Sequence, residues 1–136
     1  MKKIILATIP STGTNFFKKV FEDHGLEVKA LHLTDQGLKR VIEMGWCDGR
    51  GLYEDSVLVT TCRNWHDVKQ SWDNRGRDDN INVYLKNWFA LASLMPIVVS
   101  VDSESIPRLA VLSKAVGVEL KADWTPVPSR WKEAVR

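Results

Sequence analysis

Cysteine, net charge and long apolar runs are all scarce in this chain of 136 residues. Two cysteines are too few for a disulfide framework, so we expect reduced thiols and a cytoplasmic location. A net charge of +2 gives no support to nucleic acid or a membrane surface as a partner. No segment reaches the ~18 apolar residues of a membrane span, and the apolar run near Met1 lacks the length and cleavage site of a signal peptide.

Metal ligands and the lysine of nucleotide kinases are also missing. Cys62 and His66 are only two potential ligands, whereas a zinc site requires about four that converge, so we expect no metal site. The Walker pattern G-x-x-x-x-G-K-[ST] does not occur, which disfavours a nucleotide kinase or NTPase. The 44% hydrophobic and 26% charged residues are typical of a globular protein, and the length fits one domain over residues 1–136.

Apolar runs alternate with helical stretches along the chain. The runs predict strands at Lys3–Ile9, Glu27–Leu33, Ser56–Cys62 and Ile97–Val101. The second run alternates more than the others, which favours a place near a sheet edge, whereas the rest are typical of strands buried on both faces. Helices are predicted at Asn15–His24, from a cap at Thr34 or Asp35 to Met44, and at Asp67–Asn74, Ile81–Met95 and Ile106–Val116. This order predicts a three-layer α/β/α fold with a mostly parallel sheet of about four strands.

A loop of small polar residues, Pro10–Asn15, joins the first predicted strand to the first helix. Backbone N–H groups at such a helix start are unpaired and attract anions, and hydroxyl side chains add donors. The turn at Cys62–Asp67 lies at the same edge of the sheet, because ligands of parallel sheets bind at the carboxyl ends of the strands. The loop therefore predicts a phosphate site, with an ordinary strand-to-helix turn as the alternative.

Two motifs at this edge resemble those of the sulfotransferase superfamily. The stretch Pro10-Ser11-Thr12-Gly13-Thr14-Asn15-Phe16 is similar to the family's P-K-S-G-T-T-W. After the third strand, Arg63, Asn64, Asp67 and Ser71 match R-N-P-x-D-x-x-x-S at the same spacing, with Trp65 in place of the proline. A looser similarity, a strand followed by an acidic turn, a proline and a helix, extends to Val118, so the resemblance covers about residues 4–120.

The resemblance implies a P-loop NTPase-like fold and the sulfate donor 3′-phosphoadenosine 5′-phosphosulfate. In that arrangement Ser11, Thr12, Gly13, Thr14 and Asn15 hold the 5′-phosphosulfate, Phe16 lies beside the adenine, and Arg63 and Ser71 bind the 3′-phosphate. The chemistry of arginine agrees with this role, because its planar fork of donors matches a phosphate. The alternatives are an Arg63–Asp67 ion pair and a plain helix-face hydroxyl at Ser71.

The first motif of the chain differs from that of the family at the position of the lysine. Ser11 stands where the family has the lysine that stabilises the leaving oxygen, and Lys18 or Lys19 of the first helix are the nearest substitutes in sequence. The family's C-terminal R-K-G loop has only Arg130 and Lys132 as counterparts.

His32, at the end of the second strand, matches the histidine that the resemblance implies as general base, and a neutral imidazole suits that role. Asp35 is the second candidate, and a purely structural histidine is the alternative. We expect His24 and His66 to be structural.

The segments left over for an acceptor site are short: residues 44–55, the polar stretch 75–82 and the tail 121–136. They favour a small-molecule or peptide acceptor, or a homodimer that supplies part of the site. The sequence thus predicts a sulfotransferase acting on a hydroxyl or amine. The alternative is a catalytically inactive nucleotide-binding or interaction protein with the same fold.

Overall fold

The computed structural model describes residues 3–43, 56–77, 80–100 and 105–121, with side chains from residue 109 in the last range. Its elements, in chain order, are β1 (Lys3–Thr8), α1 (Thr14–Asp23), β2 (Val28–His32), α2 (Asp35–Glu43), β3 (Ser56–Cys62), α3 (Trp65–Asn74), α4 (Ile81–Ala92), β4 (Ile97–Ser100) and α5 (Ser105–Val116). Each predicted strand and helix is present, and the ends differ by at most three residues within the described ranges.

The strands form one parallel sheet with the order β2-β1-β3-β4. In its register, Ile4 of β1 lies between Val28 of β2 and Val57 of β3. The α/β fold with a parallel sheet is therefore confirmed, and β2 lies at an edge as its alternation predicted. Within the part of the chain that the structure describes, β4 is the other edge strand.

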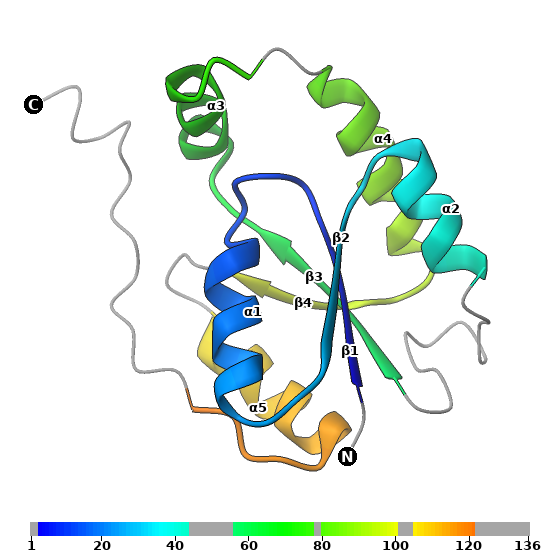
Figure 1. Cartoon of the computed structure of the whole chain (residues 1–136), viewed down its shortest axis with the longest axis vertical. Coiled ribbons are helices and arrows are strands. Elements are labelled where there is room, and N and C mark those ends of the chain that lie inside the picture. The colour runs from blue at the N-terminus through cyan, green and yellow to red at the C-terminus, as the bar shows by residue number, and fades with distance from the viewer. Residues whose placement is uncertain (1–2, 44–55, 78–79, 101–104, 122–136) are drawn as a thin grey trace, which may run out of the picture.

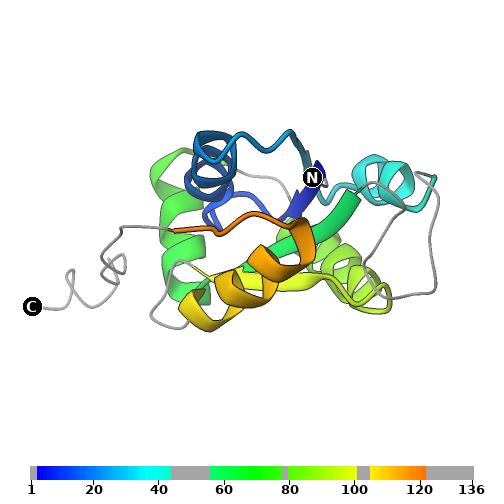
Figure 2. The same cartoon turned by 90° about the horizontal axis from the view of Figure 1, so that it is seen from below.

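Helices cover both faces of the sheet, which makes three layers (Figures 1 and 2). On one face, alternate residues of β1 and β3 pack with α1 and α5; the fully buried members include Ile4, Leu6, Phe17, Phe21, Val57, Val59 and Leu112. On the other face, the remaining strand residues pack with α2, α3 and α4 around Ile5, Ala7, Leu58, Val41, Val68 and Leu91. Apolar side chains on both faces of β1 and β3 explain why these two runs do not alternate.

Only Val99 is fully buried in β4, so the expectation that this strand is covered on both faces is wrong. Val98 borders an open apolar pocket with Trp88, Met95 and Pro96, because α4 ends at Ala92 and does not reach over it. Among the described residues, no helix has the length and apolarity needed to cross a membrane.

The sheet has a topological switch point between β1 and β3. The chain leaves β1 through α1 on one face and runs to β2, and it leaves β3 through α3 on the opposite face and runs to β4. Open α/β sheets bind ligands in the crevice that forms where the two connections diverge. At this point the structure places the Pro10–Asn15 loop and Arg63.

Candidate anion-binding site

Side chains hold the backbone of the loop that follows β1. Three successive carbonyl groups accept hydrogen bonds: Ile9 from Thr12 Oγ1 (2.6 Å), Pro10 from Trp72 Nε1 (2.9 Å) and Ser11 from Arg63 Nη1 (3.0 Å). At the far end of the loop, the hydroxyls of Thr8 and Thr14 are 2.6 Å apart. Side chains of the protein therefore supply hydrogen-bond donors to the carbonyl groups of residues 9–11.

The backbone N–H groups of the same loop remain available to a ligand. Ser11 and Gly13 have positive φ angles of 70° and 98°, and Gly13 is the N-cap of α1 without a side-chain cap. The first backbone bond into the helix runs from Phe17 N to the Gly13 carbonyl at 3.0 Å. Among the described residues, the backbone N–H groups of residues 11–15 have no acceptor. Unpaired N–H groups at a helix N-terminus are a common binding site for anions.

Three arginines line a pocket of about 250 Å³ beside this loop, which we call the arginine pocket. Arg63 follows β3, whereas Arg75 is the C-cap of α3 and Arg77 lies in the turn just beyond it. The other lining residues are Pro10, Ser11, Gly13, Thr14, Asn15, Phe16 and His32. Among the residues that the structure describes, no acidic side chain lines the pocket, so its chemistry favours an anionic ligand.

Arg63 and Ser71, which the sequence predicted in one site, both meet the loop at Ser11. Ser71 is buried on α3, and its Oγ lies 3.1 Å from the Ser11 hydroxyl. Arg63 Nη1 is bonded to the Ser11 carbonyl, whereas its Nε is buried and has no partner among the described residues. An unpaired buried donor is costly, and an anion in the arginine pocket is one ligand that would offer it an acceptor.

Arg77 is held in place by aromatic rings. Its guanidinium carbon lies 5.0 Å from the centroid of the Trp72 ring and 5.9 Å from that of Tyr84, and its Nη2 donates to the Tyr84 hydroxyl at 3.3 Å. Gly76, with φ 63°, makes the turn that brings the Arg77 backbone N–H to the Trp72 carbonyl. From the sequence, residues 75–82 were predicted to be loop material left over for an acceptor site, and neither Arg75 nor Arg77 was predicted as an anion ligand. The available signal was Arg-Gly-Arg directly after the helix that carries Ser71.

His32 lies at the end of β2 in the wall shared by the arginine pocket and a second pocket. Partial desolvation by the surrounding protein lowers the pKa of its exposed imidazole, and the positive charge of Arg77 lowers it further. The ring is therefore neutral at pH 7, which is the state that accepts a proton.

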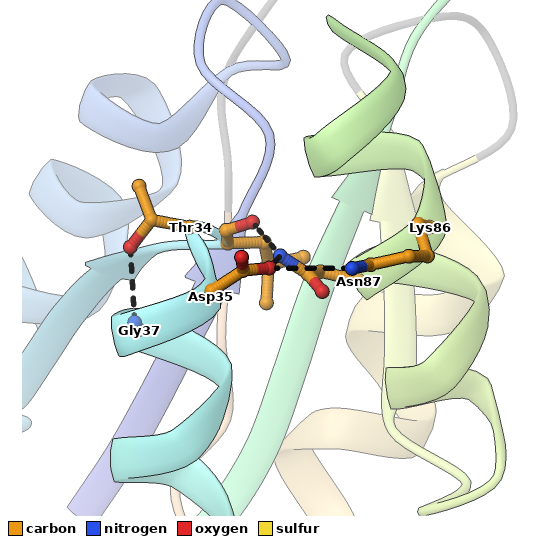
Figure 3. Close-up of polar contacts among 6 residues, drawn as sticks. Thr34, Asp35, Gly37, Lys86 and Asn87 are labelled. Carbon is orange, nitrogen blue, oxygen red and sulfur yellow. Dashed lines mark hydrogen bonds and ion pairs between the residues drawn. The ribbon is translucent and has the colours of Figure 1, made fainter. Parts of the chain in front are cut away.

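Asp35, the second candidate base, is part of a structural bridge between α2 and α4 (Figure 3). The buried amide of Asn87 donates to the Leu33 carbonyl at 2.8 Å and to Asp35 Oδ1 at 3.0 Å, and Lys86 Nζ lies 3.6 Å from the same oxygen. The Asn87 hydrogen bond and the Lys86 charge lower the pKa of this carboxyl. A carboxylate stabilised in this way is a weaker base than His32, and it lines neither of the two pockets.

The remaining predicted groups lie farther from the loop. Lys18 lines the second pocket and is 3.7 Å from Glu22, whereas Lys19 is 3.1 Å from Asp23, so neither lines the arginine pocket. His24 ends α1, where its ring accepts a hydrogen bond from Lys121 N at 3.0 Å, in agreement with a structural role.

His66 is exposed on α3 and lines neither pocket. Cys62 is a free thiol that is only half-buried. Cys47, Arg130 and Lys132 fall outside the described residues.

No protein-family model matches the chain, and neither a curated protein nor a solved structure shows significant similarity to it. Within the described ranges, no group of three or more His, Cys, Asp or Glu side chains is arranged to hold a metal ion. The site is thus defined by its own geometry: a loop with unpaired amides, three arginines and a histidine.

Proposed function

We propose that the protein binds 3′-phosphoadenosine 5′-phosphosulfate in the arginine pocket and transfers its sulfuryl group to a hydroxyl or amine. The observation that carries this proposal is the convergence of Arg63, Arg75 and Arg77, at the switch point of a parallel sheet, on a loop whose amides have no acceptor in the part of the chain that the structure describes. The donor carries a 3′-phosphate and a 5′-phosphosulfate, and both anions match such a set of cations and N–H donors.

The resemblance to the sulfotransferase superfamily assigns each part of the donor to residues of the pocket. The backbone N–H groups of residues 11–15 would donate hydrogen bonds to the 5′-phosphosulfate, and Phe16, which is half-buried in the pocket wall, would lie beside the adenine. Arg63 would bind the 3′-phosphate. Ser71 would act with it, or would support the loop through the Ser11 hydroxyl, as it does here.

The three arginines would supply the positive charge that the superfamily's lysine provides at the position of Ser11. Sulfuryl transfer, like phosphoryl transfer, depends on stabilising charge that develops on the oxygens around the transferred group. A fixed guanidinium can provide this stabilisation from a neighbouring element. Arg77 is the best candidate, because Trp72 and Tyr84 hold its side chain in position.

In the proposed reaction, an acceptor oxygen or nitrogen bonds to sulfur and the bond from sulfur to the phosphate oxygen breaks. The products are a sulfated acceptor and 3′-phosphoadenosine 5′-phosphate. His32 would take the proton from the acceptor, since its imidazole is neutral and lines the same pocket as the loop. It would then release that proton to water.

A second candidate is binding without transfer. It is favoured by the absence of a cation at Ser11, whose hydroxyl is engaged by Ser71. The two functions differ in their dependence on His32. Turnover of the donor, followed as release of 3′-phosphoadenosine 5′-phosphate in a screen of acceptors, should be lost in His32→Gln if transfer occurs, while nucleotide affinity should stay the same in either case.

Calorimetry without magnesium tests the binding step. We expect 3′-phosphoadenosine 5′-phosphate to bind more tightly than AMP or ATP, and Arg63→Gln to weaken it by about tenfold or more, because hydrogen bonds to charged groups contribute ~1.5–3 kcal/mol. Lys69→Gln is a matched control, since Lys69 is an exposed cation on α3 outside both pockets. Equal affinity for AMP, or no effect of Arg63→Gln, would refute the proposal.

A further inference from the structure

A second pocket adjoins the arginine pocket and shares His32, Thr14 and Asn15 with it. It has a volume of about 330 Å³ and lies between the N-terminal turns of α1 and α2 and the edge strand β2. We call it the α1–α2 pocket. A cavity of this size is at the low end of the range that holds small molecules.

The charged groups of the α1–α2 pocket are basic. Lys18 of α1 and Arg40 of α2 line it, whereas none of the described residues that line it is acidic. The nearest carboxylate in sequence, Asp35, is bonded to Asn87 and Lys86 on the α4 side of the helix (Figure 3). Lys18 has only a loose contact with Glu22, at 3.7 Å between exposed groups, so its ammonium remains available to a ligand.

The remaining polar groups favour the same kind of ligand. Both helices begin at this pocket, so their positive dipole ends add to the charge of the two cations. The Thr34 hydroxyl accepts from Gly37 N at 3.0 Å, which leaves its own proton free to donate. The pocket therefore combines two cations with hydrogen-bond donors. It lies next to His32, which also lines the arginine pocket.

We propose that the α1–α2 pocket is the acceptor subsite and that the acceptor is a small compound with an anionic group, carboxylate or phosphate, near its reactive hydroxyl or amine. This inference rests on the proposed function. Lys18 and Arg40 bind the anionic group, and His32, in the wall between the two pockets, faces the nucleophile. This arrangement orients the nucleophile toward the arginine pocket, where the sulfuryl group is held.

Matched pairs of probes test the charge of the acceptor. The pairs are 4-hydroxybenzoate and 4-hydroxybenzamide, glycolate and glycolamide, and glycerol 3-phosphate and glycerol, each titrated at millimolar concentration into the ¹⁵N-labelled full chain with and without 3′-phosphoadenosine 5′-phosphate. We expect at least one anionic member to bind about tenfold or more tightly than its neutral partner. The shifted amides should lie in residues 14–18 and 30–40.

Single substitutions assign the effect to the pocket. Lys18→Gln and Arg40→Gln should each reduce the preference for the anionic probe. Lys19→Gln and Lys39→Gln are the controls, because each removes an exposed cation that is next to Lys18 or Arg40 in the chain but lines neither pocket. Preference for the carboxylate pairs would indicate a carboxylic acid, and preference for glycerol 3-phosphate a phosphate ester.

Failure of this inference and failure of the proposed function give different results. If no anionic probe is preferred, or if the preference survives in both Lys18→Gln and Arg40→Gln, the acceptor class is wrong, whatever the nucleotide does. If anionic probes bind at Arg40 but 3′-phosphoadenosine 5′-phosphate does not bind, the proposed function fails, and the acceptor role with it. With both intact, Arg63→Gln should lose the nucleotide and keep the probe.

Discussion

Replacing Trp72 with phenylalanine should loosen the candidate site and destabilise the fold. The indole is buried at 4% exposure, and its Nε1 donates to the Pro10 carbonyl at 2.9 Å. The same ring lies under the Arg77 guanidinium and packs edge-on against Tyr84, with 5.4 Å between centroids. Trp72 thus supports both the loop backbone and one of the three arginines of the pocket.

The magnitude follows from two terms. Loss of the indole N–H leaves the Pro10 carbonyl without its donor, which costs ~1–3 kcal/mol for a buried group. The smaller ring leaves a void of roughly 40 Å³, which adds ~1 kcal/mol at ~24 cal/mol per Å³. We therefore expect Trp72→Phe to lower the free energy of unfolding by ~2–4 kcal/mol, or the melting temperature by roughly 10 °C for a chain of this length.

Trp88→Phe is the matched control, because Trp88 Nε1 donates to the Thr60 hydroxyl at 3.1 Å and not to the loop, and Trp88 lines neither the arginine pocket nor the α1–α2 pocket. Urea unfolding should show a loss in both variants, larger for Trp72→Phe, since Trp88 is only half-buried. Calorimetry should show affinity for 3′-phosphoadenosine 5′-phosphate about tenfold weaker in Trp72→Phe alone. A loss below ~0.5 kcal/mol in Trp72→Phe, or equal weakening of nucleotide binding in the two variants, would refute this reasoning.

Three further outcomes follow from the contacts at the end of β2. Asn87→Ala should lower the free energy of unfolding in urea by ~2–3 kcal/mol, because the buried carbonyl of Leu33 loses its donor, and a loss below ~0.5 kcal/mol would contradict that role. Gly37→Ala should cost ~3 kcal/mol or more in thermal unfolding, since its Cβ would overlap the His32 carbonyl oxygen, and a melting temperature equal to wild type would contradict the close packing. The NMR titration midpoint of His32 should lie below the ordinary value of about 6.5 and move upward in Arg77→Gln, and the rate of transfer should fall as the pH drops through that midpoint. An unshifted midpoint in Arg77→Gln would mean that the arginine charge does not reach the ring.

The parts of the site that follow directly from strand ends could be predicted from the sequence. Parallel strands end at one edge of the sheet, so the residues after β1 and β3 must lie close together once the two strands are neighbours. Arg63 and Ser71 accordingly meet the loop at Ser11, although they are 52 and 60 residues away in the chain. The burial of β1 and β3 could also be predicted, because a strand covered by helices on both faces of the sheet has apolar residues without alternation.

The parts that depend on contacts between side chains could not be predicted. Arg77 enters the pocket only because Gly76 turns the chain and because the rings of Trp72 and Tyr84 receive its guanidinium. The bridge between Asp35 and Asn87 joins residues that are 52 positions apart on two helices, and no local pattern signals it. Charge and burial at such positions are set by packing, which composition and periodicity do not encode.

The central claim is that the arginine pocket binds the nucleotide. The measurement that tests it most directly is a ¹H–¹⁵N NMR titration of the full chain with 3′-phosphoadenosine 5′-phosphate, in which both backbone amides and arginine Nε–H resonances are followed. We expect large shifts at the amides of residues 11–16 and at the Nε–H of Arg63, which is buried and has no partner among the described residues. Saturable shifts confined to another surface, or no shift at millimolar nucleotide, would contradict the claim.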